Sequence, residues 1–311
     1  MKRDVRRLES ILELADQYEG FLVDVWGVIH DGERLGEGVR DALVALSERG
    51  ARICFLSNTS RLRGDVVRQL VDFGIPRDAF VDVVSSGDVT RRALVDGSGA
   101  LWEHLPSGMI RAVHLGSPSY VPWLGELGFK LVTFEDCDAG IDLIVATGVV
   151  NDETELKGLG AMLRPHAVRG VPLVCTNPDK WIPSSRGLSR GPGVVAQTYA
   201  ELGGPTFMYG KPHPPIYKAA LERLGCTAER VVAIGDMVET DIVGASAASI
   251  ASVLVTTGVH SAALGACPDE EALLAVLAPF GVTPTAIIGR FGQGHGVFRP
   301  VRDGGPGDRP L

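Results

Sequence analysis

The segment Phe21–Val28 constrains the fold more than any other part of this sequence, because its apolar run carries a single carboxylate. The run FLVDVWGV is short, rich in Val and bounded by turn-forming residues, a pattern typical of a buried strand in a parallel sheet. Asp24 is then expected at the carboxyl end of the strand, the edge of an open α/β sheet where ligands bind. An Asp that only caps the following turn is the alternative.

Two further segments bring polar groups to comparable positions. Arg52–Ser60 is a second apolar run, and it ends in the hydroxyl and amide groups of Ser57 and Asn58, which can donate to phosphate oxygens. Tyr209–Pro215 holds Lys211 between a glycine and a proline, just before a helical pattern. Each has an alternative without a ligand, since Ser and Asn are favoured helix N-caps and a loop lysine is commonly solvated.

The third segment, Val231–Ile242, places two carboxylates after a buried strand. Asp236 and Asp241 are five positions apart, and a pair of acids at a strand end needs a cation to offset their repulsion. Hard oxygen ligands suit Mg²⁺. Asp241 could instead only cap a helix that begins at Ile242. Taken singly these signals are modest, but their fixed order predicts one site that binds an anion and a metal ion.

In these motifs the chain resembles the haloacid dehalogenase superfamily, and more narrowly its class IIA branch of nucleotide, sugar-phosphate, phosphoglycolate and pyridoxal-phosphate phosphatases. The resemblance extends from about Phe21 to about Gly289 and includes the insertion of that branch, marked by the run Cys175–Asp179 and the glycines that follow it. It implies an α/β fold, with a Rossmann-like parallel-sheet core and an inserted α/β class IIA cap domain.

The resemblance also implies a role for each motif residue. Asp24 would be the nucleophile that forms an aspartyl-phosphate. Ser57, with Asn58 beside it, would hold the phosphoryl oxygens, and Lys211 would neutralise charge. A Mg²⁺ ion would be held by Asp24, the main-chain carbonyl of Trp26, Asp236 and Asp241. Substrate contacts in the cap would come from Asn177, Asp179 and Arg186.

Position 26 departs from the family pattern. These phosphatases carry a second Asp two residues after the nucleophile, which protonates the leaving oxygen and then activates water, whereas this chain has Trp26. An indole is a donor without acceptor capacity, and loss of a general acid–base typically slows a reaction about 10²–10⁴-fold. His30 or Asp31 could supply another acid, although both also suit a turn beside Gly32.

The resulting hypothesis is a Mg²⁺-dependent, phosphatase-like hydrolase of a small phosphorylated metabolite, with turnover weakened by Trp26. The alternative is a catalytically impaired sensor or scaffold that still binds a phosphorylated metabolite. A receiver-like acceptor of phosphate from another protein fits less well, because a large cap would obstruct the donor.

The composition indicates which classes of partner and which cellular compartment to expect. The formal charge of −8 argues against nucleic-acid binding. No apolar run is long enough for a membrane span, and the amphipathic start does not resemble a signal peptide. Five cysteines without a Cys-x-x-Cys pair indicate thiols in a reducing compartment. We therefore expect a cytoplasmic protein without nucleic-acid or membrane partners, and the resemblance suggests a homodimer through the cap.

Strand and helix patterns alternate along the chain, which predicts parallel sheets covered by helices. We expect a discontinuous core over residues 1–86 and 206–289, a cap over 87–205 and a disordered tail over 290–311, where Gly, Pro and charged residues lack periodicity. An amphipathic N-terminal helix is predicted over residues 4–17. Further helices are expected at 36–49, 61–73, 120–127, 153–164 and 194–202, with strands at 81–86, 112–115, 143–146 and 172–175.

Overall fold

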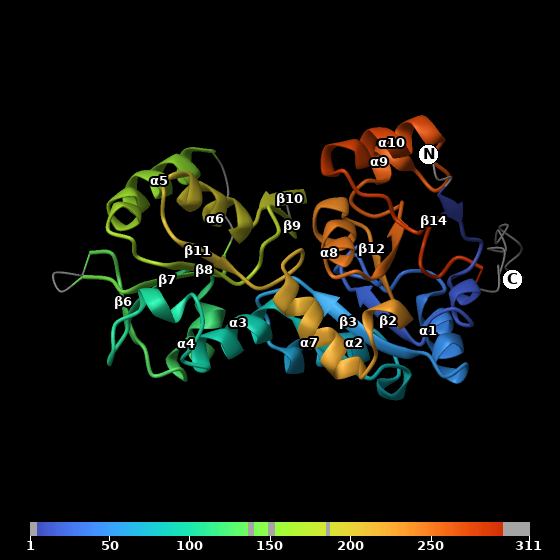
Figure 1. The fold of residues 1–311 in the computed structure, drawn as a ribbon, viewed down its shortest axis with the longest axis horizontal. Helices are drawn as coiled ribbons and strands as arrows, with labels where there is room; N and C mark the ends of the chain where they lie inside the picture. Colours follow the sequence, from blue (N-terminus) through green and yellow to red (C-terminus); the bar gives the residue numbers. More distant parts are fainter. Residues whose placement is uncertain (1–4, 136–139, 149–152, 185–186, 295–311) are drawn as a thin grey trace, which may run out of the picture.

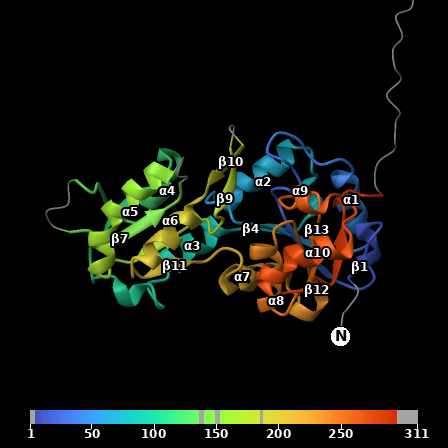
Figure 2. The same ribbon diagram turned by 90° about the horizontal axis from the view of Figure 1, so that it is seen from above.

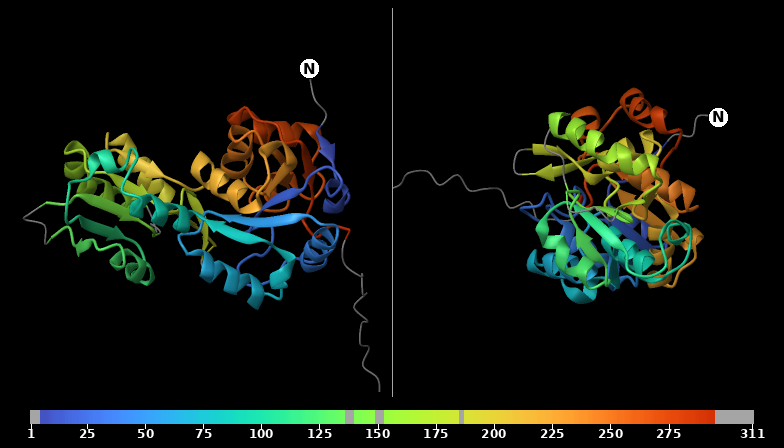
Figure 3. Two further views of the ribbon diagram at one scale, coloured as in Figure 1. Left: turned by 60° about the horizontal axis from the view of Figure 1, so that its bottom comes forward. Right: turned by 90° about the vertical axis from the view of Figure 1, so that its left-hand side faces the viewer.

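The computed structural model describes residues 5–135, 140–148, 153–184 and 187–294. These residues form two α/β units next to each other along the long axis of the molecule (Figure 1), and the left-hand view of Figure 3 shows the same separation. Each unit contains one parallel sheet with helices packed against it. The predicted fold class is therefore confirmed.

The larger unit contains a seven-stranded sheet in which every neighbouring pair is parallel. In spatial order its strands are β1 (Arg6–Arg7), β14 (Ala286–Ile288), β13 (Ala251–Val255), β12 (Val231–Gly235), β2 (Gly20–Asp24), β3 (Arg52–Ser57) and β4 (Asp82–Ser85). Every residue of β2 is buried, as expected for a strand inside a parallel sheet that is covered on both faces. The apolar run around Asp24 thus forms a strand in the interior of the sheet, between β12 and β3.

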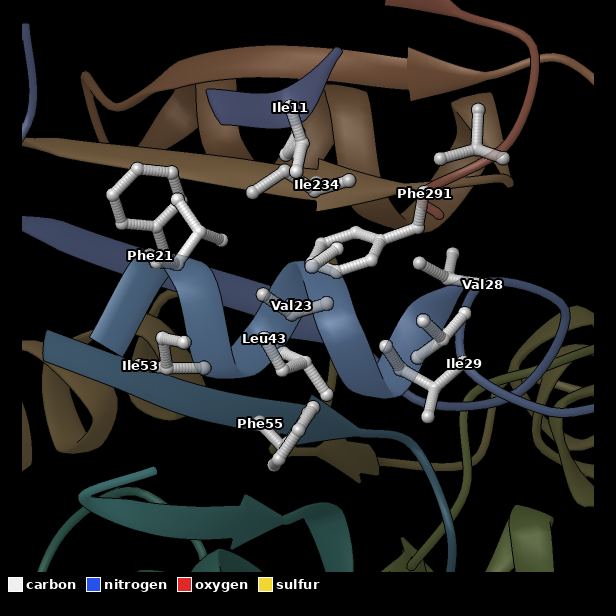
Figure 4. Packing of buried hydrophobic residues seen from close by; sticks show 14 of the residues in the cluster. Ile11, Phe21, Val23, Val28, Ile29, Leu43, Ile53, Phe55, Ile234 and Phe291 are labelled. Carbon is white, nitrogen blue, oxygen red and sulfur yellow. The ribbon is translucent and has the colours of Figure 1, made fainter. Parts of the chain in front are cut away.

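Helices cover both faces of this sheet. One face packs against α1 (Val39–Glu48) and α2 (Arg63–Asp72), and Figure 4 shows Leu43 of α1 against Phe21 and Val23 of β2. The opposite face packs against α7 (Pro214–Leu224) and α8 (Val243–Ala247), and against α10 (Glu270–Leu277) near β13 and β14. The short helix α9 is Ser261–Leu264, and α3 (Ser86–Val95) follows β4.

The smaller unit is built from the residues inserted between β4 and α7. Its parallel sheet has the order β11 (Thr206–Met208), β8 (Leu173–Cys175), β7 (Leu143–Ala146), β5 (Arg111–Leu115) and β6 (Lys130–Val132). Its helices are α4 (Val121–Gly125), α5 (Glu153–Val168) and α6 (Pro192–Glu201). An antiparallel hairpin, β9 (Trp181–Ser184) and β10 (Gly187–Arg190), lies between the two units (Figure 2).

Two of the predicted boundaries need correction. Residues 206–208 form β11 and pair with β8, so the insertion ends after Met208 instead of at residue 205. The tail predicted to be disordered from residue 290 begins with an ordered stretch, because Phe291 is 1% exposed and packs in the core (Figure 4). The rest of that tail, 295–311, lies outside the described residues.

The predicted N-terminal helix over residues 4–17 is wrong. Arg6 and Arg7 pair with β14, and Ser10 has an extended backbone that caps a single 3₁₀ turn, Ile11–Leu14. The apolar spacing still marks burial, because Leu8, Ile11 and Leu14 are all in the core. Pairing to a distant strand and the capping box at Ser10 together prevent a continuous helix. None of the helices in the described part of the chain is both long and apolar enough to cross a membrane.

Candidate active site

Three of the predicted site residues lie at the same edge of the larger sheet. Asp24 is the last residue of β2, Ser57 is the last residue of β3, and Asp236 directly follows β12. These three strands are neighbours and run parallel, so their carboxyl ends meet at one edge. The sequence patterns that ended in polar side chains therefore converge in space.

Lys211 extends into this edge from the segment that joins β11 to α7. Its Nζ donates to Asp24 Oδ1 at 2.5 Å and to Asp241 Oδ1 at 2.7 Å, and the residue is only 3% exposed. Burial lowers the pKa of Lys211, but the carboxylates of Asp24 and Asp241 outweigh burial and hold that pKa well above its usual value. The lysine is thus a fixed cation in this site, which excludes the solvated alternative.

Three carboxylates converge around this cation. Ligand atoms of Asp24, Asp236 and Asp241 all lie within 4.8 Å of one another, and all three residues are buried. Burial raises the pKa of Asp24 well above its usual range, Lys211 opposes this, and Asp241 and Asp236 add to it. Burial and the neighbouring Asp241 raise the pKa of Asp236 to about 7. One ammonium does not balance three carboxylates, so the donor set fits a divalent cation with oxygen ligands.

Close packing of the backbone fixes the Asp236 carboxylate. A Cβ added at Gly27 or Gly258 would lie 2.2 or 2.0 Å from Asp236 Oδ2, and the same oxygen accepts the Val259 backbone N–H at 2.8 Å. Gly27 also has φ of 84°, which favours glycine. The carbonyl of the preceding residue, Trp26, accepts no hydrogen bond from the described residues, so it remains available to a cation.

Asp241 is held in a similar way. Its Oδ2 accepts the Met237 backbone N–H at 3.1 Å, while its Oδ1 accepts from Lys211. Met237 lies four residues before Asp241, at the start of a π-helical turn over Val238–Ile242. Asp241 therefore does more than cap a following helix, because one of its carboxylate oxygens accepts from Lys211.

Asn58 links the two units. Its Nδ2 donates to Asp179 Oδ1 at 2.7 Å and to the Lys211 carbonyl at 3.0 Å, and its Oδ1 accepts the Lys211 backbone N–H at 2.7 Å. Both amide hydrogens are therefore used within the protein. Ser57 differs, because its Oγ accepts the Thr59 backbone N–H at 3.3 Å and keeps its own proton to donate. Neither residue caps α2, whose N-cap is Leu62.

Two of the cap residues predicted to contact substrate, Asn177 and Asp179, lie on the insertion side of the same site. Asn177 Oδ1 accepts the Asp179 backbone N–H at 2.9 Å, and both residues line the cavity above the three carboxylates. Burial raises the pKa of Asp179 to about 6, although Lys211 and Asn58 oppose the shift. The predicted contact Arg186 lies outside the described residues.

This cavity has a volume of about 360 Å³. Besides the carboxylates and Lys211, it is lined by Trp26 and His30 of the larger unit and by Tyr120 and Trp181 of the insertion. Tyr120 was missed as a site residue. Its place just beyond β5, a strand of the inserted sheet, was the available signal, but nothing local shows that this strand end faces the other unit.

The two candidates for a substitute acid differ in position. The Asp31 side chain is exposed, and its Oδ1 accepts the backbone N–H groups of Glu33 and Arg34, as in an ordinary turn. His30 is buried and lines the cavity. The turn interpretation therefore describes Asp31, while His30 remains next to the site.

Comparisons with known proteins agree with this geometry. Residues 21–130 match the haloacid dehalogenase-like hydrolase family, and residues 208–278 match a HAD-hydrolase-like family. A crystal structure of a haloacid dehalogenase-like hydrolase from Brucella suis 1330 is 30% identical, with a TM-score of 0.73 over 90% of this chain and 98% of that chain.

Two named phosphatases are also similar. An acid sugar phosphatase from Staphylococcus aureus is 26% identical over 250 residues, which cover 79% of this chain and 89% of that protein. A glycerol phosphate phosphatase from Mycobacterium tuberculosis, solved in complex with magnesium, is 25% identical with a TM-score of 0.64, covering 91% of this chain and 78% of that chain.

Proposed function

Because this chain belongs to the haloacid dehalogenase-like hydrolases, within their class IIA branch, we propose that it hydrolyses a small phosphorylated metabolite through an aspartyl-phosphate on Asp24. The observation that carries this proposal is the position of Asp24. It ends a strand inside the sheet, touches Lys211 and faces two further carboxylates. A structural Asp at this position needs no such surroundings.

The group that would complete the site is Mg²⁺. Asp24, the Trp26 carbonyl, Asp236 and Asp241 would hold it, and the substitution at position 26 leaves this set intact because the ligand there is a main-chain atom. When bound, Mg²⁺ supplies the positive charge that lets an anionic phosphate approach a carboxylate. The magnesium complex of the mycobacterial relative supports this choice of metal.

The chain's own residues then perform the first step. An Asp24 carboxylate oxygen attacks phosphorus, the new O–P bond forms, and the bond between phosphorus and the leaving oxygen breaks. The Lys211 ammonium stabilises charge on Asp24 and on the phosphoryl group. The Ser57 hydroxyl donates to a phosphoryl oxygen. Asn58 acts as a positioning residue, because its amide holds the Lys211 backbone and reaches Asp179 of the cap.

Trp26 determines which part of the cycle is slow. The indole cannot give a proton to the leaving oxygen, so departure is favoured only for weakly basic leaving groups. The indole also cannot take a proton from the water that must attack the aspartyl-phosphate. We therefore propose that the phosphoenzyme accumulates and that its hydrolysis limits turnover.

The test is phosphate release by the purified full chain. The panel contains sugar phosphates, glycerol phosphate and 4-nitrophenyl phosphate, each with Mg²⁺ and with a chelator. Asp24→Asn is the key variant, and Asp16→Asn is its matched control, because Asp16 is an exposed carboxylate that does not line the cavity. Mg²⁺-dependent release that is lost only in Asp24→Asn supports the proposal, whereas equal release by both variants excludes Asp24 as nucleophile.

The same residue, Trp26, favours a second candidate function. A protein that has lost its acid–base group but kept Asp24, Lys211 and the carboxylate cluster could bind a phosphorylated metabolite as a sensor. Retention of the nucleophile favours the enzyme, since a sensor does not need one. Ligands that raise the melting temperature without any phosphate release would favour the sensor.

A further inference from the structure

The cavity extends beyond the carboxylate cluster toward α2. On that side it is lined by Arg61 and Gln69 of the larger unit, by Tyr120 of the insertion, and by Trp26 and His30. None of these side chains has a part in the phosphoryl-transfer chemistry proposed above. Together they form a region that we call the α2 subsite.

Arg61 is a cation without an acidic partner. Its Nη1 donates to Gln69 Oε1 at 3.2 Å, a neutral group, and no carboxylate of the described residues lies within ion-pair distance. The other arginines nearby behave differently, because Arg63 pairs with Asp82 and Arg68 pairs with Asp65. The guanidinium therefore has several donors available to a ligand.

His30 supplies an independent second observation. It is 4% exposed, and its Nδ1 accepts the Gly32 backbone N–H at 2.9 Å. In the neutral ring Nε2 then carries the proton, and this buried Nε2 has no hydrogen-bond partner among the described residues. A buried donor without an acceptor is unfavourable, so an acceptor from a ligand would satisfy it.

The His30 ring lies on the α2 side of the cavity. It packs on Phe73, at the end of α2, with ring centroids 4.7 Å apart. Burial lowers the pKa of His30, Asp31 opposes the shift, and the Arg61 charge adds to it. Burial raises the pKa of Tyr120, and the Arg61 charge opposes that shift. Arg61, His30 and Tyr120 all line this cavity.

The α2 subsite and the carboxylate cluster line the same cavity but have different cations, because Arg61 is hydrogen-bonded to Gln69 of α2 whereas Lys211 is hydrogen-bonded to Asp24 and Asp241. The charges that act most strongly on the pKa of Asp24, after burial, come from Lys211, Asp241 and Asp236. Arg61 is not needed to explain the charge balance there. An arginine in the same cavity but outside this group is positioned for a different part of the substrate.

We propose that the α2 subsite binds a second anionic group, carried by the leaving part of the substrate. Arg61 pairs with this oxyanion, His30 donates from Nε2, and the Trp26 and Tyr120 rings line the space between it and the phosphoryl group. The substrate class is therefore a phosphate ester that also bears a carboxylate or a second phosphate. This inference rests on the proposed function, because it assumes that the phosphoryl group lies at Asp24.

Binding of non-hydrolysable aryl phosphonates to the full chain with Mg²⁺, measured by calorimetry, tests the proposal. The carboxyphenylphosphonates, meta and para, are compared with the carbamoylphenylphosphonates, which have the same shape without the charge. A phenylene diphosphonate carries a second phosphorus oxyanion in place of the carboxylate. Comparing it with the carboxyphenylphosphonates shows whether the subsite prefers a carboxylate or a second phosphate. Wild type should prefer at least one anionic ligand to its neutral match by about 10-fold or more, as expected for charged hydrogen bonds.

Variants of the subsite test which residues cause the preference for the anionic ligand. Arg61→Gln should remove most of the preference, and Arg61→Lys should restore part of it. Arg68→Gln is the matched control, because Arg68 is a nearby arginine on α2 that does not line the cavity. His30→Phe, which keeps the ring on Phe73 but loses the donor, should lower the preference by roughly 3–10-fold. Equal affinity for the charged and neutral ligands, no binding of either, or an unchanged preference in Arg61→Gln would overturn the proposal.

The phosphonate ligands also separate this inference from the proposed function. If phosphate release fails across substrates while the Arg61-dependent preference persists, the protein binds the predicted ligand class without hydrolysing it, and the subsite stands. If phosphate release depends on Asp24 while the preference for the anionic ligand is absent, the proposed phosphatase function is supported and the proposed α2 subsite is wrong.

Discussion

The amide of Asn58 permits a quantitative prediction, because all of its polar contacts are known. Two neutral hydrogen bonds join it to the Lys211 backbone, and each contributes about 1 kcal/mol net. A third ends on the Asp179 carboxylate and contributes about 1.5–3 kcal/mol. Asn58→Ala also leaves a buried Lys211 N–H without its partner. The three bonds together contribute about 3.5–5 kcal/mol, so we expect at least this loss in the free energy of unfolding.

Urea unfolding followed by tryptophan fluorescence measures this loss, at about pH 8, where Asp179 is ionised. Thr59→Ala is the matched control, because among the described residues the Thr59 hydroxyl accepts a single 3.3 Å bond, from the exposed Arg61 backbone N–H. The loss of this bond should stay below about 1 kcal/mol. Asn58→Asp should be at least as destabilising as Asn58→Ala, since it places a second carboxylate against Asp179.

A double-mutant cycle with Asp179→Ala isolates the contact between the two units. The coupling energy should be about 1.5–3 kcal/mol. If Asn58→Ala is no more destabilising than Thr59→Ala, or if the coupling is near zero, then Asn58 does not connect the cap to Lys211 in the way described.

Three further predictions concern the charge of the site. Trp26→Asp should raise steady-state phosphate release by about 10²–10⁴-fold, since it restores a group that can give and take a proton; an unchanged rate would show that Trp26 serves binding or packing instead. Gly258→Ala should abolish Mg²⁺-dependent activity and lower the melting temperature, because its Cβ would lie 2.0 Å from Asp236 Oδ2; normal Mg²⁺ affinity in this variant would contradict that packing. The raised pKa values of Asp179, about 6, and Asp236, about 7, mean that the metal-free folded state holds more protons than the unfolded chain. Its stability should therefore fall as pH rises from about 4 to 7. The gain in melting temperature on adding Mg²⁺ should accordingly grow from pH 5.5 to pH 8, and a gain independent of pH would refute this.

Much of the site could be predicted because its residues follow local patterns. Asp24, Ser57 and Asp236 each end or follow an apolar run, and parallel strands bring such ends to one edge of the sheet. Three of the five strands of the inserted sheet, β5, β7 and β8, were predicted from comparable runs, and β7 has the predicted bounds Leu143–Ala146. The short strands β6 and β11 were not predicted. Such patterns predicted parallel sheets covered by helices, whereas the division into a core and an inserted cap came from the family resemblance.

Contacts between distant segments could not be predicted. The bonds from Asn58 to Lys211 and Asp179 join residues more than 120 positions apart. The N-terminal segment has a helical apolar spacing, but it pairs with β14 instead. Phe291 lies in a stretch without periodicity and is nevertheless buried. In each case the partner, and not the local sequence, determines the structure.

The homodimer through the cap, the cytoplasmic location and the absence of nucleic-acid or membrane partners stay predictions. They concern the outer surface of the protein and its location in the cell, which the geometry of the site does not test. Sedimentation of the purified protein would test the first of them.

The most direct test of the central claim is to trap the phosphoenzyme. The full chain is mixed with 4-nitrophenyl phosphate and Mg²⁺, quenched in acid within the first turnovers and examined by intact-protein and peptide mass spectrometry. We expect one added phosphoryl group per chain, located on Asp24, absent from Asp24→Asn and depleted in Trp26→Asp. Steady phosphate release without any phosphorylated Asp24, or the same added mass in Asp24→Asn, would contradict it.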